Sequence, residues 1–409
     1  MSQEHKRVYL DHGATTAVDP EVKKEMLKYF SEEYGNASQM YEIGRNANMA
    51  VQDAREKVAA LIGAKLPREI IFNSGGTEAD NTALKGIMFN NKNKKKHLIT
   101  SVIEHPAILR TAEFIETQRF KVTFLPVDNF GLVDPEELKK AITNDTALVS
   151  IMHANNEIGT IEPVKELAEI AHDAGALFHT DAVQTVGKIP LDVQKLDIDL
   201  LSLSSHKIYG PKGVGALYKR QGVFLQPIMH GGGHEKGYRS GTENVAGIVG
   251  LGKAAEIAEK ELPTELPRLT KMRDRLIDNL LKVEDTILNG HRTQRLPHNA
   301  NLSFKYVEGE ALILRLDAKG IYGSTGSACS TAKLEASHVL LAIGLPHAVA
   351  HGSLRLTLGR WTTDKEIDYV LEEVPKVIHE LREMSAFRRE TEEFVMGLKD
   401  EHDDDHCET

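Results

Sequence analysis

The stretch TALVSIMHANNEIGTIEPVKELAEIAHDAGALFHTDAVQ, residues 146–184, determines the fold class. It begins with an apolar run typical of a buried strand, continues through a helical pattern over residues 163–175 that ends at a glycine, and returns to a second strand-like run. A strand, a helix and a strand in this order are typical of a crossover between parallel strands. The stretch therefore predicts a parallel sheet with a helix packed on its face.

The same alternation extends in both directions from this stretch. Strands are predicted at residues 69–74, 97–101, 121–127, 199–207 and 214–220, and helices at 77–89, from Pro106 onward and at 134–142. Asp134 and Pro135 are residue types that favour the start of a helix. The expected fold class is α/β, with a mostly parallel sheet covered by helices on both faces.

The pattern changes near residue 250. Two long amphipathic helices are predicted, at about 245–260 and 264–282, and fewer strands follow them. A smaller α+β domain is expected there. The predicted division is a large domain at 14–258, a small domain at 1–13 and 259–395, and an acidic tail at 396–409 that is expected to be disordered.

Composition excludes several classes of protein. The chain has 409 residues, 27% of them charged, and a net charge of −10, which argues against non-specific nucleic-acid binding. Its two cysteines, Cys329 and Cys407, are too few for a disulfide scaffold and fit a reducing compartment. The first residues lack the apolar stretch of a signal peptide, and no run of ~18 apolar residues is present to span a membrane. A cytoplasmic protein is expected.

The segment SLSSHKIYGPKGVGALY, residues 202–218, carries the first chemical signal. Lys207 directly follows an apolar strand and precedes a Gly-Pro-Lys-Gly turn. A lysine that forms a Schiff base needs such a rigid, partly desolvated position. Ser204 and His206 beside it are suited to binding phosphate oxygens. For this string alone, an exposed turn lysine is the preferred interpretation.

Asp181 ends another predicted strand, 26 residues before Lys207. The cofactor pyridoxal phosphate works as an electron sink when a carboxylate keeps its ring nitrogen protonated, and Asp181 is a candidate for that carboxylate. Gln184 is a candidate hydrogen-bond donor to the ring phenolate. Alternatively, Asp181 caps a helix or a turn.

The string SGGTEADN, residues 74–81, is a junction between a strand and a helix. Its two glycines allow the backbone to approach an anion, and Gly76 and Thr77 open the helix. The N-terminus of a helix binds phosphate through its free N–H groups. Because many α/β loops have this composition, the motif gains its weight from Lys207 and Asp181 in the same chain.

With these segments together, the chain resembles the cysteine desulfurases, in the class-V aminotransferase group of fold-type I pyridoxal-phosphate enzymes. The resemblance covers nearly the whole chain. Its blocks, in order, are YLDHGATT (9–16), YGNAS (34–38), SGGTEADN (74–81), EHPAI (104–108), HANNEIG (153–159), TDAVQ (180–184), SSHKIYGPKG (204–213), RSGTEN (239–244), GSACS (326–330) and GSLRLTLGR (352–360).

The resemblance assigns roles to individual residues. Lys207 would bond covalently to the cofactor, and His105 would stack on its ring and assist acid–base steps. Asn156 and Arg355 would bind the substrate carboxylate, for which an Arg fork is suited. The remaining cofactor contacts fall on Gly76, Thr77, Asp181, Gln184, Ser204 and His206, and on Thr242, which would reach the phosphate from the second subunit of a homodimer.

Cys329 distinguishes this chain from an aminotransferase. It lies in YGSTGSACSTAKLEASHVL, residues 322–340, among small and polar residues that suit a mobile loop. A thiolate there can attack the substrate sulfur and carry it as a persulfide. An ordinary buried cysteine is the alternative, which the polar neighbours disfavour. The length of this segment resembles the desulfurases that serve iron–sulfur cluster assembly.

The predicted reaction is conversion of L-cysteine to L-alanine, with transfer of the sulfur from Cys329 to acceptor proteins such as an iron–sulfur scaffold protein. Two alternatives remain at this point: a selenocysteine lyase or other class-V aminotransferase on the same scaffold, and a non-catalytic homologue. No metal is expected, because the spacing in the tail string HDDDHC, residues 402–407, matches no zinc pattern.

Overall fold

The computed structural model describes residues 7–90, 92, 94–325 and 336–385. The sulfur-carrying residue predicted from the sequence, Cys329, lies outside these ranges, as does the acidic tail at 396–409.

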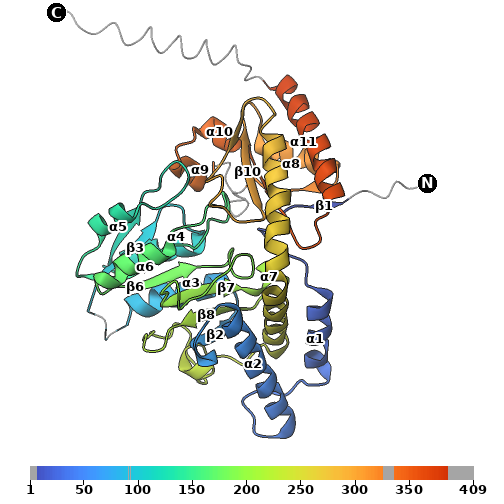
Figure 1. Ribbon diagram of the computed structural model, residues 1–409. Helices are drawn as coiled ribbons and strands as arrows, with labels where there is room; N and C mark the ends of the chain where they lie inside the picture. The colour runs from blue at the N-terminus through green and yellow to red at the C-terminus, as the bar shows by residue number, and fades with distance from the viewer. Residues whose placement is uncertain (1–6, 91, 93, 326–335, 386–409) are drawn as a thin grey trace, which may run out of the picture.

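A seven-stranded sheet forms the centre of the molecule, with strand order β2-β8-β7-β6-β5-β3-β4 (Figure 1). Only β8 runs antiparallel to its neighbours, so the prediction of a mostly parallel sheet is confirmed. The strands are β2 (Ile70–Asn73), β3 (His97–Ser101), β4 (Lys121–Leu125), β5 (Thr146–Ser150), β6 (Leu177–Asp181), β7 (Leu200–Ser204) and β8 (Gly215–Lys219).

Both faces of the sheet are buried, because successive side chains of a strand point to opposite faces. On β7, Leu200 packs into one hydrophobic cluster and Leu201 into another. Leu148 and Val149 of β5 divide in the same way. The helices α3 (Gly76–Met88) and α4 (Pro106–Thr117) cover one face, and α1 (Pro20–Ser31), α2 (Glu42–Leu61), α5 (Pro135–Ala141) and α6 (Val164–Asp173) contribute to the cluster on the other.

A second, smaller layer lies above the sheet in Figure 1. Its antiparallel sheet has the order β12-β10-β9, and helices pack against it around a separate hydrophobic cluster. Its elements are β9 (Thr286–Leu288), β10 (Asn299–Phe304), α8 (Gly309–Ala318), α9 (His338–Ala342), α10 (His347–His351), β12 (Ser353–Thr357) and α11 (Asp364–Met384). The short strand β1 (Val8–Tyr9) pairs with β11 (Ile321–Tyr322), so the N-terminus joins this layer.

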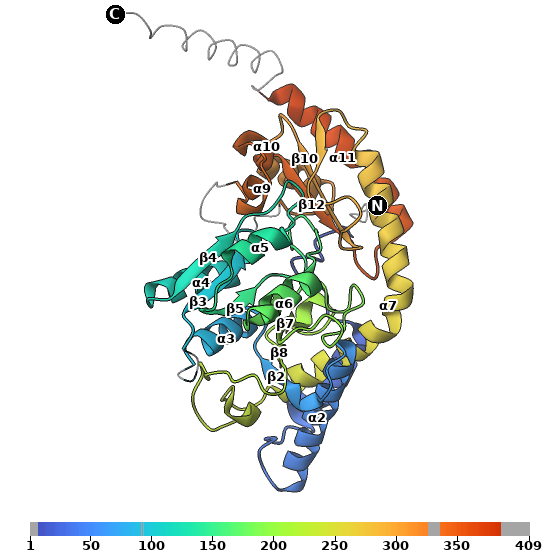
Figure 2. The same ribbon diagram turned by 60° about the vertical axis from the view of Figure 1, so that its left-hand side comes forward.

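One long helix, α7 (Val245–Leu280), links the two layers, as Figures 1 and 2 show. The prediction of two helices, at about 245–260 and 264–282, is therefore wrong. Pro263 and Pro267 lie inside α7, and proline usually ends or kinks a helix. The helix continues because its first half packs in the core of the large sheet and its second half in the core of the small one.

A second correction concerns the predicted strand at 199–207. β7 ends at Ser204, and residues Ser205–Lys207 form a 3-10 turn, η2. The Ile208 N–H donates to the Ser205 carbonyl (3.0 Å), which closes the turn. Lys207 therefore stands beyond the carboxyl end of the strand, where ligands bind in open α/β sheets.

Candidate active site

Lys207 is held at the carboxyl edge of the sheet by the N-terminal segment of the chain. Its Nζ donates to the carbonyl of Gly13 (2.5 Å) and to that of Ala14 (2.8 Å). The backbone also joins the two segments, because the Thr16 N–H donates to the carbonyl of His206 (3.0 Å). The amine is therefore fixed by backbone carbonyls and lies in a partly buried position.

Asp181 reaches the same edge because β6 and β7 are parallel neighbours, with Asp181 paired to Ser202. Only 7% of Asp181 is exposed, and its Oδ1 accepts from the Val183 N–H (2.9 Å). The turn-capping interpretation is thus correct, and it fixes the carboxylate in place. Burial raises the pKa of Asp181, while the nearby His105 and Lys207 charges act to lower it.

His105 precedes α4, and its position determines which ring nitrogen holds the proton. Its Nδ1 accepts from the Ala107 N–H (3.1 Å), so in the neutral ring the proton lies on Nε2. Burial lowers the pKa of His105, and the positive charge of Lys207 acts in the same direction, whereas Asp181 raises it. Lys207, Asp181 and His105 therefore lie close enough for their charges to interact.

The N-terminus of α3 forms a bare backbone surface opposite Ser204. Gly75 has φ of +146°, a conformation that L-residues rarely adopt, and a Cβ added to it would lie 3.7 Å from Ser204 Oγ. A Cβ on Gly76 would lie 2.8 Å from Val183 Cγ2. Gly75, at the N-cap, has no side chain to cap this helix start, and its own N–H donates to Asn73 Oδ1 (3.0 Å). The N–H groups of this helix start are therefore suited to an anion such as a phosphate.

These features fit pyridoxal phosphate. Lys207 supplies an amine for its aldehyde, Asp181 a buried carboxylate for its ring nitrogen, and the start of α3 a phosphate site. His206 follows Ser204 by two residues, with Nδ1 3.1 Å from Thr15 Oγ1, and burial is the main cause that lowers its pKa to about 4. A neutral His206 can donate one hydrogen bond to an anion.

Gln184 and the N-terminal segment complete the wall around Lys207. Gln184 Nε2 donates to the Gly13 carbonyl (3.0 Å), the same oxygen that Lys207 contacts. The sequence motif YLDHGATT marked this segment, but sequence reasoning did not assign it a role in the site. Its contribution comes from backbone carbonyls, which carry no signal in residue type.

Arg355 and Asn156 also lie together. Arg355 Nη1 donates to the Asn156 carbonyl (3.0 Å), and Nη2 forms an ion pair with Asp11 (2.8 Å). Arg355 is 3% exposed. Its buried Nε has no hydrogen-bond partner among the residues that the structure describes. The guanidinium thus retains a donor for an anionic group, and Asp11 is a site residue that sequence reasoning missed.

Two buried acids beside Asp181 were also missed. Glu104 is completely buried, and burial raises its pKa to about 8 although Ser101 Oγ (2.7 Å) and the Met152 N–H (3.0 Å) donate to it. Burial also raises the pKa of Asp80, and the charge of Asp181 adds to this effect. A raised pKa favours the neutral form of a carboxyl group, and a neutral carboxyl group adds no negative charge beside Asp181.

Two further predicted site residues are exposed in this chain. Thr77 lies in the first turn of α3, and Thr242 lies in the loop before α7. In the ranges that the structure describes, no three His, Cys, Asp or Glu side chains are grouped to hold a metal ion. No helix within the same ranges is long and apolar enough to cross a membrane.

Comparison with known proteins gives concordant results. The aminotransferase class-V family model matches residues 8–370. Cysteine desulfurase IscS of Methanosarcina thermophila is 57% identical over 94% of this chain and 95% of that protein. Two solved structures also match: a NifS-like protein (TM-score 0.86, 41% identity, 91% of this chain and 100% of that one) and SspA in complex with cysteine (TM-score 0.77, 35% identity, 87% and 100%).

The family match, the high identity over nearly the full length and the site geometry agree. The chain belongs to the class-V aminotransferase family and, within it, to the cysteine desulfurases, which are pyridoxal-phosphate enzymes of fold type I.

Proposed function

We propose that this protein is a pyridoxal-phosphate-dependent cysteine desulfurase that converts L-cysteine to L-alanine and carries the sulfur as a persulfide on Cys329. The observation that carries the proposal is the meeting of Lys207, Asp181 and the start of α3 at one edge of the sheet. The desulfurase relatives support the same reaction. Neither the selenocysteine lyase nor the non-catalytic alternative is favoured by any of these findings.

Lys207, Asp181 and His105 have separate roles in the proposed reaction. The cofactor, when bound, withdraws electrons from the substrate α-carbon. Lys207 Nζ accepts the α-proton, and Asp181 stabilises positive charge at the ring nitrogen. His105 presents its Nε2 proton for acid–base steps, because Nδ1 is occupied by the Ala107 N–H.

Arg355 binds the substrate carboxylate in this proposal. Its free Nε is one donor, and the ion pair with Asp11 supplies a second if the substrate carboxylate replaces Asp11 at Nη2. The ion pair with Asp11 compensates the buried charge of Arg355 until the substrate binds. The backbone carbonyl of Asn156 accepts a hydrogen bond from the same guanidinium, which places Asn156 beside it.

The sulfur transfer requires Cys329, since no group described at the site is a thiol. The Cys329 thiolate attacks the substrate sulfur, an S–S bond forms, and the substrate Cβ–S bond breaks. The electron pair of the broken bond stays with the carbon skeleton, which leaves as alanine after protonation. The persulfide sulfur then passes to an acceptor protein, with an iron–sulfur scaffold protein as the expected partner. We also propose that the enzyme is located in the cytoplasm.

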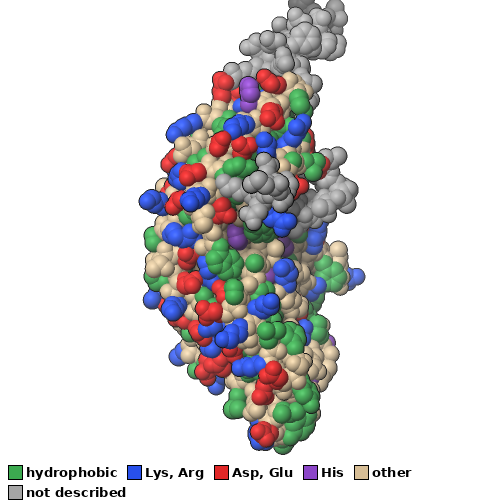
Figure 3. Space-filling model, turned by 90° about the vertical axis from the view of Figure 1, so that its right-hand side faces the viewer, with side chains coloured by type: hydrophobic (Ala, Val, Ile, Leu, Met, Phe, Trp, Pro, Cys, Tyr) green, Lys and Arg blue, Asp and Glu red, His purple; other side chains and the backbone are tan. Residues whose placement is uncertain are grey.

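The active unit is a homodimer in this proposal. Exposed apolar side chains gather at the lower end of the molecule (Figure 3), the end at which Figure 1 places the link between α1 and α2. They are Leu27, Phe30, Tyr34, Met40, Tyr41 and Met49, which are 54–88% exposed. An apolar patch of this kind is typical of an interaction surface. Thr242 of one subunit would then reach the phosphate of the other.

Lys207→Ala should abolish both the visible absorbance of lysine-bound cofactor and turnover, because the Gly13 and Ala14 carbonyls hold the amine of Lys207 at this site. Lys212→Ala, in the same turn but exposed, is the matched control and should keep both. Absorbance spectra and borohydride reduction followed by peptide mass spectrometry make the measurement. Cofactor still linked to the chain in Lys207→Ala would refute the assignment.

Cys329→Ala should retain lysine-bound cofactor but lose persulfide and sulfide production, since alanine cannot accept sulfur. After incubation with L-cysteine, mass spectrometry should show one added sulfur, about 32 Da, on the Cys329 peptide of the wild type and of Cys407→Ala. Sulfide release by Cys329→Ala at near the wild-type rate would show that this cysteine is incidental.

Phe30→Glu should weaken the homodimer by roughly tenfold or more, because it places a charge in the apolar patch. Leu314→Glu, at a 69% exposed leucine on α8, is the control and should leave association unchanged. Sedimentation velocity over a concentration series makes the comparison. A wild type that stays monomeric at micromolar concentration and remains fully active would contradict the dimer proposal.

A further inference from the structure

The loop before α7, residues 230–244, is fastened to its own chain by two ion pairs. We call this loop the arm. It carries Thr242, the residue expected to reach the phosphate in the partner subunit. The ion pairs attach the arm to α2 and to α3, the helix whose start forms the phosphate site of the same chain, and a hydrogen bond attaches it to β2.

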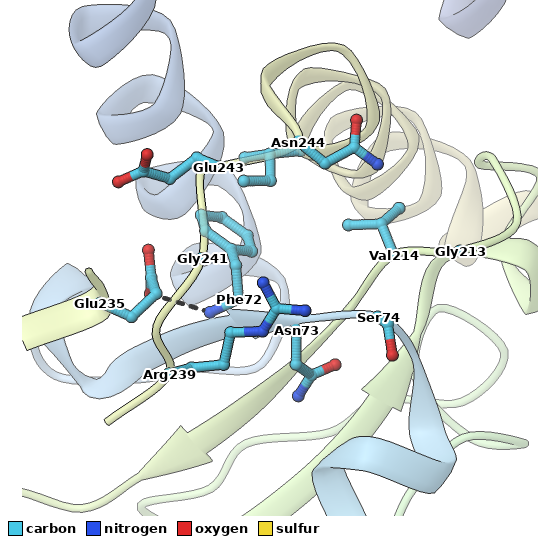
Figure 4. A pocket seen from close by; sticks show the side chains of 11 residues that line it. Phe72, Asn73, Ser74, Gly213, Val214, Glu235, Arg239, Gly241, Glu243 and Asn244 are labelled. Atoms are coloured by element: carbon cyan, nitrogen blue, oxygen red, sulfur yellow. Dashed lines mark hydrogen bonds between the residues drawn. The ribbon is translucent and has the colours of Figure 1, made fainter. Parts of the chain in front are cut away.

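The first ion pair joins Glu235 of the arm to Arg55 of α2. The contact is bidentate, at 2.7 and 2.8 Å, and both side chains are nearly inaccessible, at 5% and 6% exposure. Glu235 Oε2 also accepts from the Phe72 N–H of β2 (2.9 Å), as Figure 4 shows. Arg55 Nη1 donates to the Ile70 carbonyl (2.7 Å). Two opposite charges can remain buried when they are paired with each other and their other hydrogen-bonding groups also have partners.

The backbone at this contact is strained. Glu235 and Lys236 have φ of +46° and +57°, and neither is glycine. Residues adopt this conformation when surrounding contacts over-determine it. The contacts of Glu235 with Arg55 and Phe72 hold the backbone in this conformation, so the arm has a fixed shape at its midpoint.

The second ion pair joins Arg239 of the arm to Glu78 in the first turn of α3. Arg239 Nε lies 2.9 Å from Glu78 Oε1, and Nη2 lies 3.4 Å from Oε2. The Ser74 N–H also donates to Glu78 (2.9 Å). Burial acts to raise the pKa of Glu78, but the bonds from Arg239 and Ser74 outweigh it and lower the pKa, so the carboxylate stays charged.

The arm is fixed again at its end. Asn244 caps α7, with Oδ1 accepting from the Gly247 N–H (3.0 Å). Thr242 therefore lies between two fixed points, Arg239 and Asn244, and is itself exposed. Figure 4 shows the pocket beside the arm. Arg239 lies next to Phe72 and Asn73 on one side of it, and Asn244 lies on the other side.

From this arrangement we propose that Glu78, Arg239, Glu235 and Arg55 are positioning residues for the phosphate site of the partner subunit. The two ion pairs and the Phe72 hydrogen bond fasten the arm to α2, β2 and the start of α3. Each phosphate site thereby holds in place the threonine that completes the other site. This inference rests on the proposed function, because it requires the cofactor, the dimer and an arm that crosses between subunits.

Arg239→Gln is the variant that tests this inference. The side chain of Arg239 is 24% exposed, and Glu78, which loses its partner in this variant, still accepts from the Ser74 N–H. The variant dimer should lose cofactor during dialysis roughly tenfold faster than the wild type. Glu113→Gln, which removes an exposed pair with Arg110, is the control and should keep the wild-type rate.

Mixed dimers decide whether the arm acts across the interface. In a dimer of one Lys207→Ala subunit and one Arg239→Gln subunit, the visible absorbance comes from the Arg239→Gln subunit, whose site receives an intact arm. Cofactor loss should return to the wild-type rate. When both changes are on one subunit and the other is wild type, the absorbing site receives the damaged arm, and loss should be fast.

The opposite pattern, with no rescue in the first mixed dimer and slow loss in the second, would show that the ion pair supports its own site and would overturn the inference. An unchanged rate in the Arg239→Gln dimer would overturn it as well. A wild type that is monomeric, or that shows no lysine-bound cofactor, would instead refute the proposed function, so the two failures are distinguishable.

Discussion

The parallel pairing of β6 with β7 is the constraint on which the site depends. It brings Asp181 and the turn that carries Lys207 to one edge of the sheet. In a parallel pair, both carboxyl ends meet at the same edge, so a carboxylate and an amine that are 26 residues apart become neighbours. Because β2 and β7 are both antiparallel to β8, they run in the same direction, and the start of α3 reaches that edge too.

The second constraint is the N-terminal segment, which crosses from the small layer to the large one. β1 pairs with β11 in the small layer, and a few residues later Gly13 and Ala14 hold Lys207 of the large one. Asp11 between them pairs with Arg355 on β12. The amine and the guanidinium, proposed to act on the α-hydrogen and the carboxylate of one substrate, are therefore positioned by a single short stretch of the chain.

The sequence predicted the large sheet well, because its strands are apolar runs between clear helical patterns; the predicted strand at 97–101 matches β3. The helices α1 and α2 were not predicted. The two prolines of α7 suggested a break that packing in two cores overrides. Contacts such as Arg355 with Asp11 join residues 344 positions apart and depend on tertiary structure alone. Residue types reveal which side chains carry chemistry, but not which carbonyls hold them.

The central claim is that sulfur leaves L-cysteine by transfer to the enzyme and that the carbon skeleton leaves as alanine. A single-turnover experiment with sulfur-labelled L-cysteine and no acceptor protein tests it most directly. The account predicts a burst of alanine stoichiometric with the subunits, with the label bound to the chain and released by a thiol reductant. Formation of pyruvate and free sulfide without alanine, and with no label on the protein, would contradict it.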